Sequence, residues 1–125
     1  MALQILIADD EPHISRALSF VLQKEGFSID VATNGAEALQ KIREKRPMVA
    51  FLDIVMPKMT GLELCREIRS DPEIKDTHII ILTAKGQELD RQNCMAAGAD
   101  EYLTKPFSPK EVLERVRELF PQGEA

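Results

Sequence analysis

The sequence predicts an α/β fold, a doubly wound three-layer sandwich in which five parallel strands form one sheet with helices on both faces. A short apolar run followed by a helix-like stretch occurs five times along the 125 residues. The apolar runs are continuous rather than alternating, which is typical of parallel strands buried on both faces. Right-handed crossovers leave few topologies. We expect the strand order 2-1-3-4-5, with the first and last helices on one face and the other three helices on the opposite face.

The first strand is predicted over Leu3–Ala8, an almost entirely apolar run. Three consecutive acids, Asp9–Glu11, follow it. Pro12 then suits the first turn of a helix, because its missing N–H needs no partner there. Gly26 fits the position just past the end of that helix.

The second strand is predicted over Ser28–Ala32 and is shorter. Asn34 can cap the helix that follows, since its side chain can accept a hydrogen bond from the first turn. That helix is expected over Gly35–Lys45, with an apolar stripe on one side. Pro47 closes it.

The third strand, Val49–Leu52, ends abruptly in one carboxylate, Asp53. The last residue of such a strand emerges at the carboxyl edge of the sheet, where open α/β sheets bind their ligands. Thr60 and Glu63 have the spacing of a capping box. The third helix is therefore expected to begin at this capping box, Thr60–Glu63, and to run to about Ser70.

The last third of the chain repeats the pattern twice. A strand over His78–Leu82 contains three consecutive isoleucines, and a polar, less regular helix follows at about Glu88–Ala97. A short strand is predicted over Glu101–Leu103. Ser108–Glu111 has capping-box spacing with Pro at the first helical position, and it opens the last helix.

Length and composition indicate one domain, residues 1–120, with residues 121–125 as a tail or the start of a linker. Apolar content of 44% and charged content of 30% are ordinary for a soluble globular protein. A net charge of −5 argues against direct nucleic-acid binding by this segment. There is no stretch of membrane-spanning length and no signal-peptide pattern, so we expect no membrane association and a cytoplasmic location.

The cysteines and histidines do not form a recognisable metal or redox motif. Cys65 and Cys94 lie far apart in helix-like stretches and are interpreted as buried, reduced thiols. His13 and His78 have no partner at ligand spacing and are interpreted as surface or hydrogen-bonded histidines. There is also no zinc pattern, Gly-rich nucleotide loop or nucleophile elbow.

Polar residues stand at the ends of four predicted strands: Asp9 and Asp10, Asp53, Thr83 and Lys105. The carboxyl ends of parallel strands share one edge of the sheet, so we expect these side chains to converge. Neighbouring carboxylates repel one another, and a hard divalent cation relieves that repulsion. An all-oxygen ligand set suits Mg²⁺ (or Mn²⁺) better than zinc or copper.

The same set suits phosphoryl transfer, which depends mainly on positioning and on neutralising charge. Asp53 supplies a nucleophilic oxygen that would form an aspartyl phosphate. Lys105 would screen the phosphoryl charge, and the Thr83 hydroxyl could hydrogen-bond a phosphoryl oxygen. Each residue alone has an ordinary structural interpretation, but their joint arrival at one edge favours the functional one.

Together with their neighbours in the chain, these strand-end residues match the motifs of a known protein family. The chain resembles the receiver domain of bacterial two-component response regulators, which implies a flavodoxin-like fold. The resemblance runs from Leu3 to about Phe120. The matching motifs are Ile7–Glu11, Leu52–Pro57 with Gly61, Leu82–Ala84 and Gly98–Phe107.

The resemblance implies a role for each acid. Asp53 is implied as the phosphoacceptor. Asp10 and Asp53 are implied as direct Mg²⁺ ligands, with the backbone carbonyl of Val55 as a third. Asp9 would act mainly through a metal-bound water.

The resemblance also implies that Lys105 pairs with the phosphoryl group and that the Lys105–Pro106 peptide bond is cis. Thr83 and Tyr102 resemble the pair of residues that switch on phosphorylation. The chain departs from the commonest family pattern at Met48 and Thr60, where aspartates are frequent. Neither residue belongs to the site chemistry.

The implied phosphodonor is a histidine kinase or a histidine phosphotransfer protein, and the chain would be a phosphoacceptor rather than an enzyme. Phosphorylation would reshape the face formed by Glu88–Ala97, Glu101–Leu103 and the last helix, which would control an output domain or target protein. A phosphorylation-dependent homodimer is also implied, although Ala96 stands where winged-helix regulators often have Glu. The charges suited to it are Asp90, Arg91, Asp100, Glu101 and Arg115.

Three alternatives stay open at this stage. A haloacid-dehalogenase-type phosphohydrolase also uses an aspartyl nucleophile, but it needs a second Asp where this chain has Val55. A flavin binder of flavodoxin type would need a hydroxyl- and Gly-rich loop where Asp9–Glu11 stand. A degenerate receiver would bind partners without phosphorylation. The sequence also leaves open whether the chain is part of a longer regulator.

Overall fold

The strands follow the predicted order. The computed structural model describes residues 4–84 and 88–120, with the backbone alone at 84 and 88–91. Its five strands form one sheet in the order β2-β1-β3-β4-β5, and all neighbouring pairs are parallel. The strands are β1 Ile5–Ala8, β2 Ile29–Ala32, β3 Val49–Asp53, β4 His78–Ala84 and β5 Glu101–Lys105.

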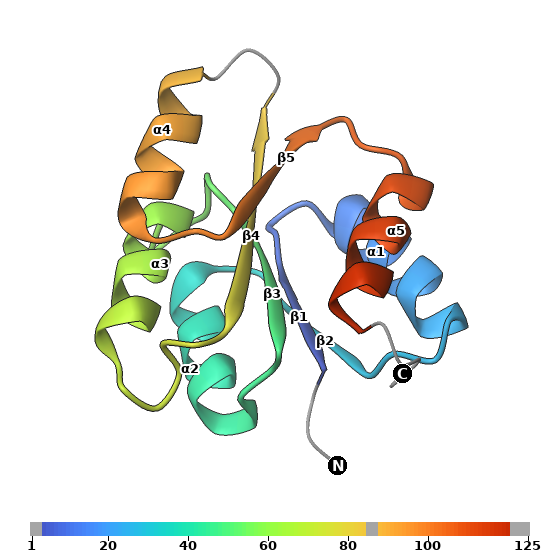
Figure 1. The fold of residues 1–125 in the computed structure, drawn as a ribbon, viewed down its shortest axis with the longest axis horizontal. Coiled ribbons are helices and arrows are strands. Elements are labelled where there is room, and N and C mark those ends of the chain that lie inside the picture. The colour runs from blue at the N-terminus through green and yellow to red at the C-terminus, as the bar shows by residue number, and fades with distance from the viewer. Residues whose placement is uncertain (1–3, 85–87, 121–125) are drawn as a thin grey trace.

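The helices cover the two faces of the sheet as expected. Helices α1 and α5 lie on one face, and α2, α3 and α4 lie on the other (Figure 1). The doubly wound, flavodoxin-like fold is therefore confirmed. The helices are α1 Pro12–Lys24, α2 Gly35–Lys45, α3 Gly61–Ser70, α4 Glu88–Ala97 and α5 Pro109–Leu119.

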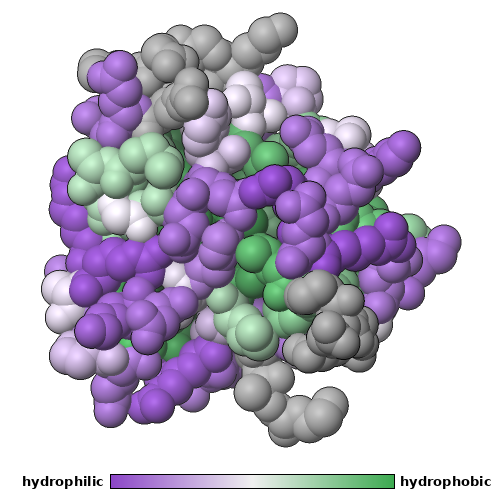
Figure 2. All heavy atoms as spheres, viewed as in Figure 1, coloured by the Kyte–Doolittle hydropathy of each residue, from purple (hydrophilic) through white to green (hydrophobic). Residues whose placement is uncertain are grey.

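Two apolar layers sandwich the sheet and fix its strands. One layer packs beneath α1 and α5, and the other beneath α2, α3 and α4. Every residue of β1 and β3 is buried, as the continuous apolar runs predicted. On the face turned toward the viewer, hydrophilic residues surround the patches of apolar residues that remain visible (Figure 2). None of the described helices is long and apolar enough to cross a bilayer.

The predicted caps hold the helix starts. Asn34 Oδ1 accepts the Glu37 N–H at 2.8 Å. Thr60 and Glu63 form both bonds of a capping box. For Ser108 the structure gives one of the two predicted bonds, from the Glu111 N–H to Ser108 Oγ at 3.0 Å.

The predicted strand ends were wrong at four places. β2 begins at Ile29 rather than at Ser28. β1 begins at Ile5, because Gln4 hydrogen-bonds the Ser28 hydroxyl instead; Leu3 lies outside the described residues. β4 and β5 each continue two residues beyond their apolar runs, to Ala84 and Lys105. Backbone pairing of the two strands extends through these polar ends, so the apolar runs underestimated the strands.

The isolated cysteines and histidines behave largely as interpreted. Cys65 and Cys94 are both buried, free thiols. His13 is exposed. His78 is half-buried, with Nε2 2.5 Å from a carboxylate oxygen of Glu101.

Candidate functional site

Three charged side chains meet at the carboxyl edge of the sheet. Asp9 directly follows β1, Asp53 ends β3, and Lys105 ends β5. The Lys105 Nζ lies 3.1 Å from Asp9 Oδ2 and 3.4 Å from Asp53 Oδ2. The predicted convergence of these residues, distant in sequence, is therefore observed.

The acids at this edge are close enough to share one cation. Asp9, Asp10, Glu11 and Asp53 each offer a carboxylate oxygen, and these oxygens all lie within 4.8 Å of one another. Asp9 and Asp53 are buried, whereas Asp10 and Glu11 are exposed. A set of hard oxygen donors open to solvent on one side fits Mg²⁺ or Mn²⁺, which retain several waters.

The surroundings of Asp53 disfavour its negative charge. Burial, followed by repulsion from the Asp9 carboxylate, raises the pKa of Asp53 to about 6. Attraction to Lys105 and the Val55 N–H, which lies 3.3 Å from Asp53 Oδ1, acts in the opposite direction. A bound cation would relieve this unfavourable charge.

Lys105 keeps its positive charge despite its position. Burial disfavours the ammonium, but its hydrogen bond to Asp9 and its attraction to Asp53 outweigh burial and raise the pKa of Lys105. The site therefore contains a permanently charged ammonium, that of Lys105, beside the candidate nucleophile Asp53.

Thr83 is the buried hydroxyl of the site. In the register of the sheet Asp53 pairs with Leu82, so Thr83 lies one residue further along the neighbouring strand. Thr83 is 3% exposed, and its Oγ1 makes no hydrogen bond with the residues that the structure describes. A buried hydroxyl without a partner is costly, and it can serve an incoming acceptor.

The loop after β3 is held tightly against the strand end. Gly61 N–H donates to the Ile54 carbonyl at 3.0 Å. A Cβ on Gly61 would lie 2.5 Å from the Asp53 carbonyl oxygen, so only glycine permits this approach. Val55 lies exposed on the loop. The Lys105–Pro106 bond is cis, as expected.

Glu11 is a residue of the site that the sequence pattern does not single out beyond its place in the acidic run Asp9–Glu11. The structure places Glu11 Oε1 3.3 Å from Lys105 Nζ. Its position directly after Asp10, at the start of α1, was the one available sign in the sequence.

Comparison with known proteins identifies the family. The model of the response regulator receiver domain matches residues 5–117. The chain belongs to this family. Membership separates it from the phosphohydrolase and flavin-binding alternatives.

Similar proteins agree with this membership. The chain is 47% identical over 116 residues to the transcriptional regulatory protein ResD of Bacillus subtilis, covering 93% of the chain and 47% of ResD. It is 40% identical to the DNA-binding response regulator MtrA of Mycolicibacterium smegmatis, covering 99% of the chain and 53% of MtrA. The chain thus spans about half the length of these relatives.

Solved structures of receiver domains superimpose closely. A putative response regulator from Chloroflexus aurantiacus gives a TM-score of 0.89 at 34% identity, covering 95% of this chain and 98% of that one. The chemotaxis response regulator CheY4 of Vibrio cholerae gives 0.87 at 33% identity, covering 95% and 99%.

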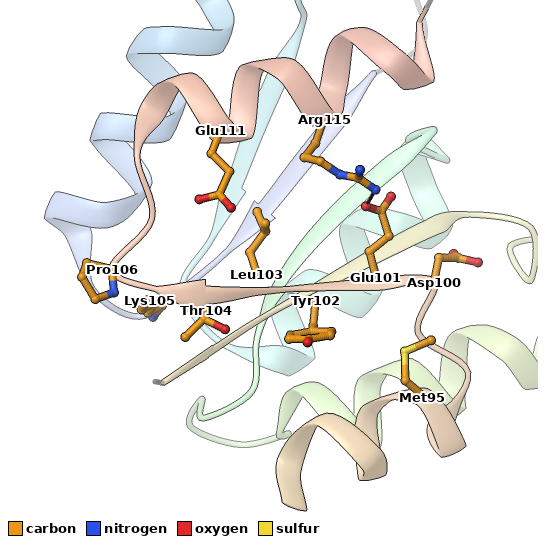
Figure 3. Close-up of a pocket in the computed structure, with 10 residues that line it drawn as sticks. All are labelled: Met95, Asp100, Glu101, Tyr102, Leu103, Thr104, Lys105, Pro106, Glu111 and Arg115. Atoms are coloured by element: carbon orange, nitrogen blue, oxygen red, sulfur yellow. Dashed lines mark ion pairs between the residues drawn. The ribbon is translucent and has the colours of Figure 1, made fainter. Parts of the chain in front are cut away.

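A shallow groove of about 780 Å³ lies along β5 of the receiver domain, between α4 and α5 (Figure 3). Tyr102, the predicted switch residue, lines it beside Met95. The groove is lined by Met95, Asp100, Glu101, Tyr102, Leu103, Thr104, Lys105, Pro106, Glu111 and Arg115.

Charges proposed for a dimer already have partners within the chain. Glu101 pairs with Arg115, and the two side chains point toward one another (Figure 3). Asp100 Oδ2 lies 2.7 Å from Arg69 Nη2. Dimerisation through these residues would require an exchange of partners. The side chains of Asp90 and Arg91 lie outside the described part of the structure.

Proposed function

We propose that this receiver domain accepts a phosphoryl group on Asp53 and passes the change to its α4–β5–α5 face. The observation that carries the proposal is the placement of a buried carboxylate, Asp53, beside a fixed ammonium, Lys105, at the ligand-binding edge of the sheet. The donor would be a histidine kinase or a histidine phosphotransfer protein.

The residues present fit a divalent cation. Asp10, Asp53 and the Val55 carbonyl would hold Mg²⁺ (or Mn²⁺) directly, and Asp9 would act through a water. The support is the all-oxygen donor set and the raised pKa of Asp53. When bound, the cation supplies positive charge that neutralises phosphoryl oxygens.

Phosphoryl transfer to Asp53 would need only a few side chains. An Asp53 carboxylate oxygen forms a bond to phosphorus as the bond to the donor nitrogen breaks, and that nitrogen leaves with the electron pair. Lys105 neutralises charge on the phosphoryl oxygens, and the Thr83 hydroxyl donates a hydrogen bond to one of them. The domain assists its own phosphorylation and dephosphorylation and is otherwise a phosphoacceptor, not a turnover enzyme.

Thr83 would couple phosphorylation of Asp53 to the change of the α4–β5–α5 face. Phosphorylation adds about −1.5 to −2 units of charge beside it. Thr83 would turn toward the new oxygens, and Tyr102 would move into the space that it leaves. This biases a two-state surface at α4, β5 and α5. Because ResD and MtrA carry regulatory names and are about twice as long, we propose a longer, cytoplasmic regulator with an output domain or target protein at this face.

The test is phosphorylation by acetyl phosphate with Mg²⁺, followed by intact mass and by base lability of the product. We expect one added phosphoryl group in the wild-type chain and none in Asp53→Asn. Asp76→Asn is the matched control, since Asp76 is exposed and lies just before β4, at the edge of the sheet opposite the site. Unchanged phosphorylation of Asp53→Asn, or none in the wild type, would defeat the proposal. Sedimentation with and without beryllofluoride tests the dimer.

A further inference from the structure

We propose that Glu11 is the exchangeable partner of Lys105, and that its charge restrains phosphorylation of Asp53 by anionic donors. In the unphosphorylated domain Glu11 would share the ammonium with the two buried aspartates, and it would release that ammonium to the phosphoryl group. This inference rests on the proposed function and adds a residue to it.

The three partners of Lys105 differ in their freedom to move. The side chains of Asp9 and Asp53 are 0% and 8% exposed, whereas that of Glu11 is 48% exposed. Asp9 Oδ1 also accepts the Glu11 N–H at 2.8 Å, and Asp53 Oδ1 accepts the Val55 N–H. The Glu11 carboxylate has, besides Lys105, only a 3.7 Å pair with the exposed His13 among described residues. Water can replace these contacts, so Glu11 is the partner that can leave.

The charge of Glu11 acts on two steps in opposite directions. Four carboxylates lie together at this edge, and three of them, those of Asp9, Glu11 and Asp53, pair with the Lys105 ammonium, so negative charge is in excess. An additional carboxylate favours a divalent cation but repels an incoming phosphoryl dianion and competes for Lys105. Removing the charge should therefore weaken cation binding while it accelerates transfer.

The negative charge of Glu11 can be removed by substitution without the loss of a helix cap. Glu11 occupies the cap position of α1 without capping it through its side chain, so substitution removes no helix cap. Glu11→Gln keeps an oxygen that can accept from Lys105 but loses the charge, and Glu11→Ala loses both. Glu114→Gln, at an exposed position on α5, changes the net charge equally and serves as the control.

The experiment measures phosphorylation rates at saturating Mg²⁺ with two donors, and Mg²⁺ affinity without a donor. We expect Glu11→Gln to react with acetyl phosphate about two- to fivefold faster than wild type and to bind Mg²⁺ about two- to fivefold more weakly, the size typical of an exposed charge pair. The rate gain should be smaller with phosphoramidate, which carries less negative charge at neutral pH. Glu11→Ala should gain at least as much as Glu11→Gln, and Glu114→Gln should match wild type.

The outcomes separate the two proposals. A Glu11→Gln rate with acetyl phosphate equal to or below wild type overturns the role of Glu11 and leaves the phosphoacceptor assignment intact. An equal gain with both donors also overturns it, since the charge would then not be the cause. No phosphorylation of the wild-type chain at Asp53 overturns both.

Discussion

The Lys105 ammonium lies 3.4 Å from Asp53 Oδ2, although β4 separates the two strands that carry these residues. The contact therefore bridges the end of β4, and it depends on how far β3 and β5 extend on either side. It helps to keep a buried carboxylate largely ionised at neutral pH, because the ammonium partly offsets burial and the repulsion of Asp9.

Replacing Lys105 by Met should raise the pKa of Asp53 above its value of about 6, since the replacement removes an attraction that lowers it. NMR titration of the Asp53 carboxyl carbon measures this directly. Lys105→Arg keeps the charge and should stay closer to wild type. An unchanged or lower pKa in Lys105→Met would contradict the electrostatic account of the site.

Asp53→Asn should stabilise the cation-free domain at neutral pH. The pKa of Asp53 is raised from 3.8 to about 6 on folding, so the folded state favours the protonated form. The charge therefore costs stability above about pH 6 and nothing below about pH 4. After allowance for solvent screening, we expect a gain of about 1–2 kcal/mol at pH 7.5.

Urea unfolding in EDTA across this pH range checks that prediction. The difference between Asp53→Asn and wild type should shrink as the pH falls through about 6 toward 4. A variant that is less stable than wild type at pH 7.5, or a gain that grows at low pH, would show that burial does not penalise this carboxylate.

The sequence predicted the strand order and the convergence at the carboxyl edge because both follow from chain-level patterns. Continuous apolar runs imply a parallel sheet, and a parallel sheet brings its strand ends together. Asp9, Asp53 and Lys105 therefore needed no side-chain detail to be grouped.

Contacts that depend on side-chain conformation could not be predicted in this way. The reach of Glu11 to Lys105, and of His78 to Glu101, joins residues that no periodicity relates. The ends of β4 and β5 were missed because polar residues such as Thr83 and Thr104 still pair through the backbone. Hydropathy reports side-chain burial, whereas strand length is set by backbone pairing.

Mg²⁺ should stabilise the folded domain, because only the folded chain gathers the acidic oxygens. The rise in Tm at saturating Mg²⁺ should be nearly lost in Asp10→Asn and kept in Asp76→Asn. It should also weaken as the pH falls through about 6, where protons compete with the cation for Asp53. Thermal unfolding with and without EDTA measures both effects. An undiminished Mg²⁺ effect in Asp10→Asn would place the cation elsewhere.

Thr83→Val should separate stability from switching. The Thr83 hydroxyl is buried without a hydrogen-bond partner among the described residues, so the isosteric Val should stabilise the unphosphorylated domain by about 1 kcal/mol. The same change removes the proposed donor to the phosphoryl group. We therefore expect a smaller change in the NMR signal of Tyr102 on adding beryllofluoride. A destabilised variant, or an unchanged Tyr102 response, would contradict this role.

Gly61→Ala should damage both stability and phosphorylation, because the added Cβ would lie 2.5 Å from the Asp53 carbonyl oxygen and 2.9 Å from Ile54 Cα. Relieving such a clash moves the backbone, at a cost of about 1–3 kcal/mol. The displaced segment carries the nucleophile, so the rate with acetyl phosphate should fall as well.

Gly26→Ala is the matched comparison for that variant. Gly26 has φ +96° past the end of α1, so alanine there should cost about 1–2 kcal/mol through backbone strain alone. Because Gly26 connects α1 to the start of β2, it lies at the edge of the sheet opposite the carboxyl ends that form the site, and its variant should be phosphorylated at the wild-type rate. Urea unfolding and the acetyl phosphate assay measure the two effects separately. If Gly61→Ala lost stability but kept the wild-type rate, the close packing of Gly61 on Asp53 would be structural and would not position the nucleophile.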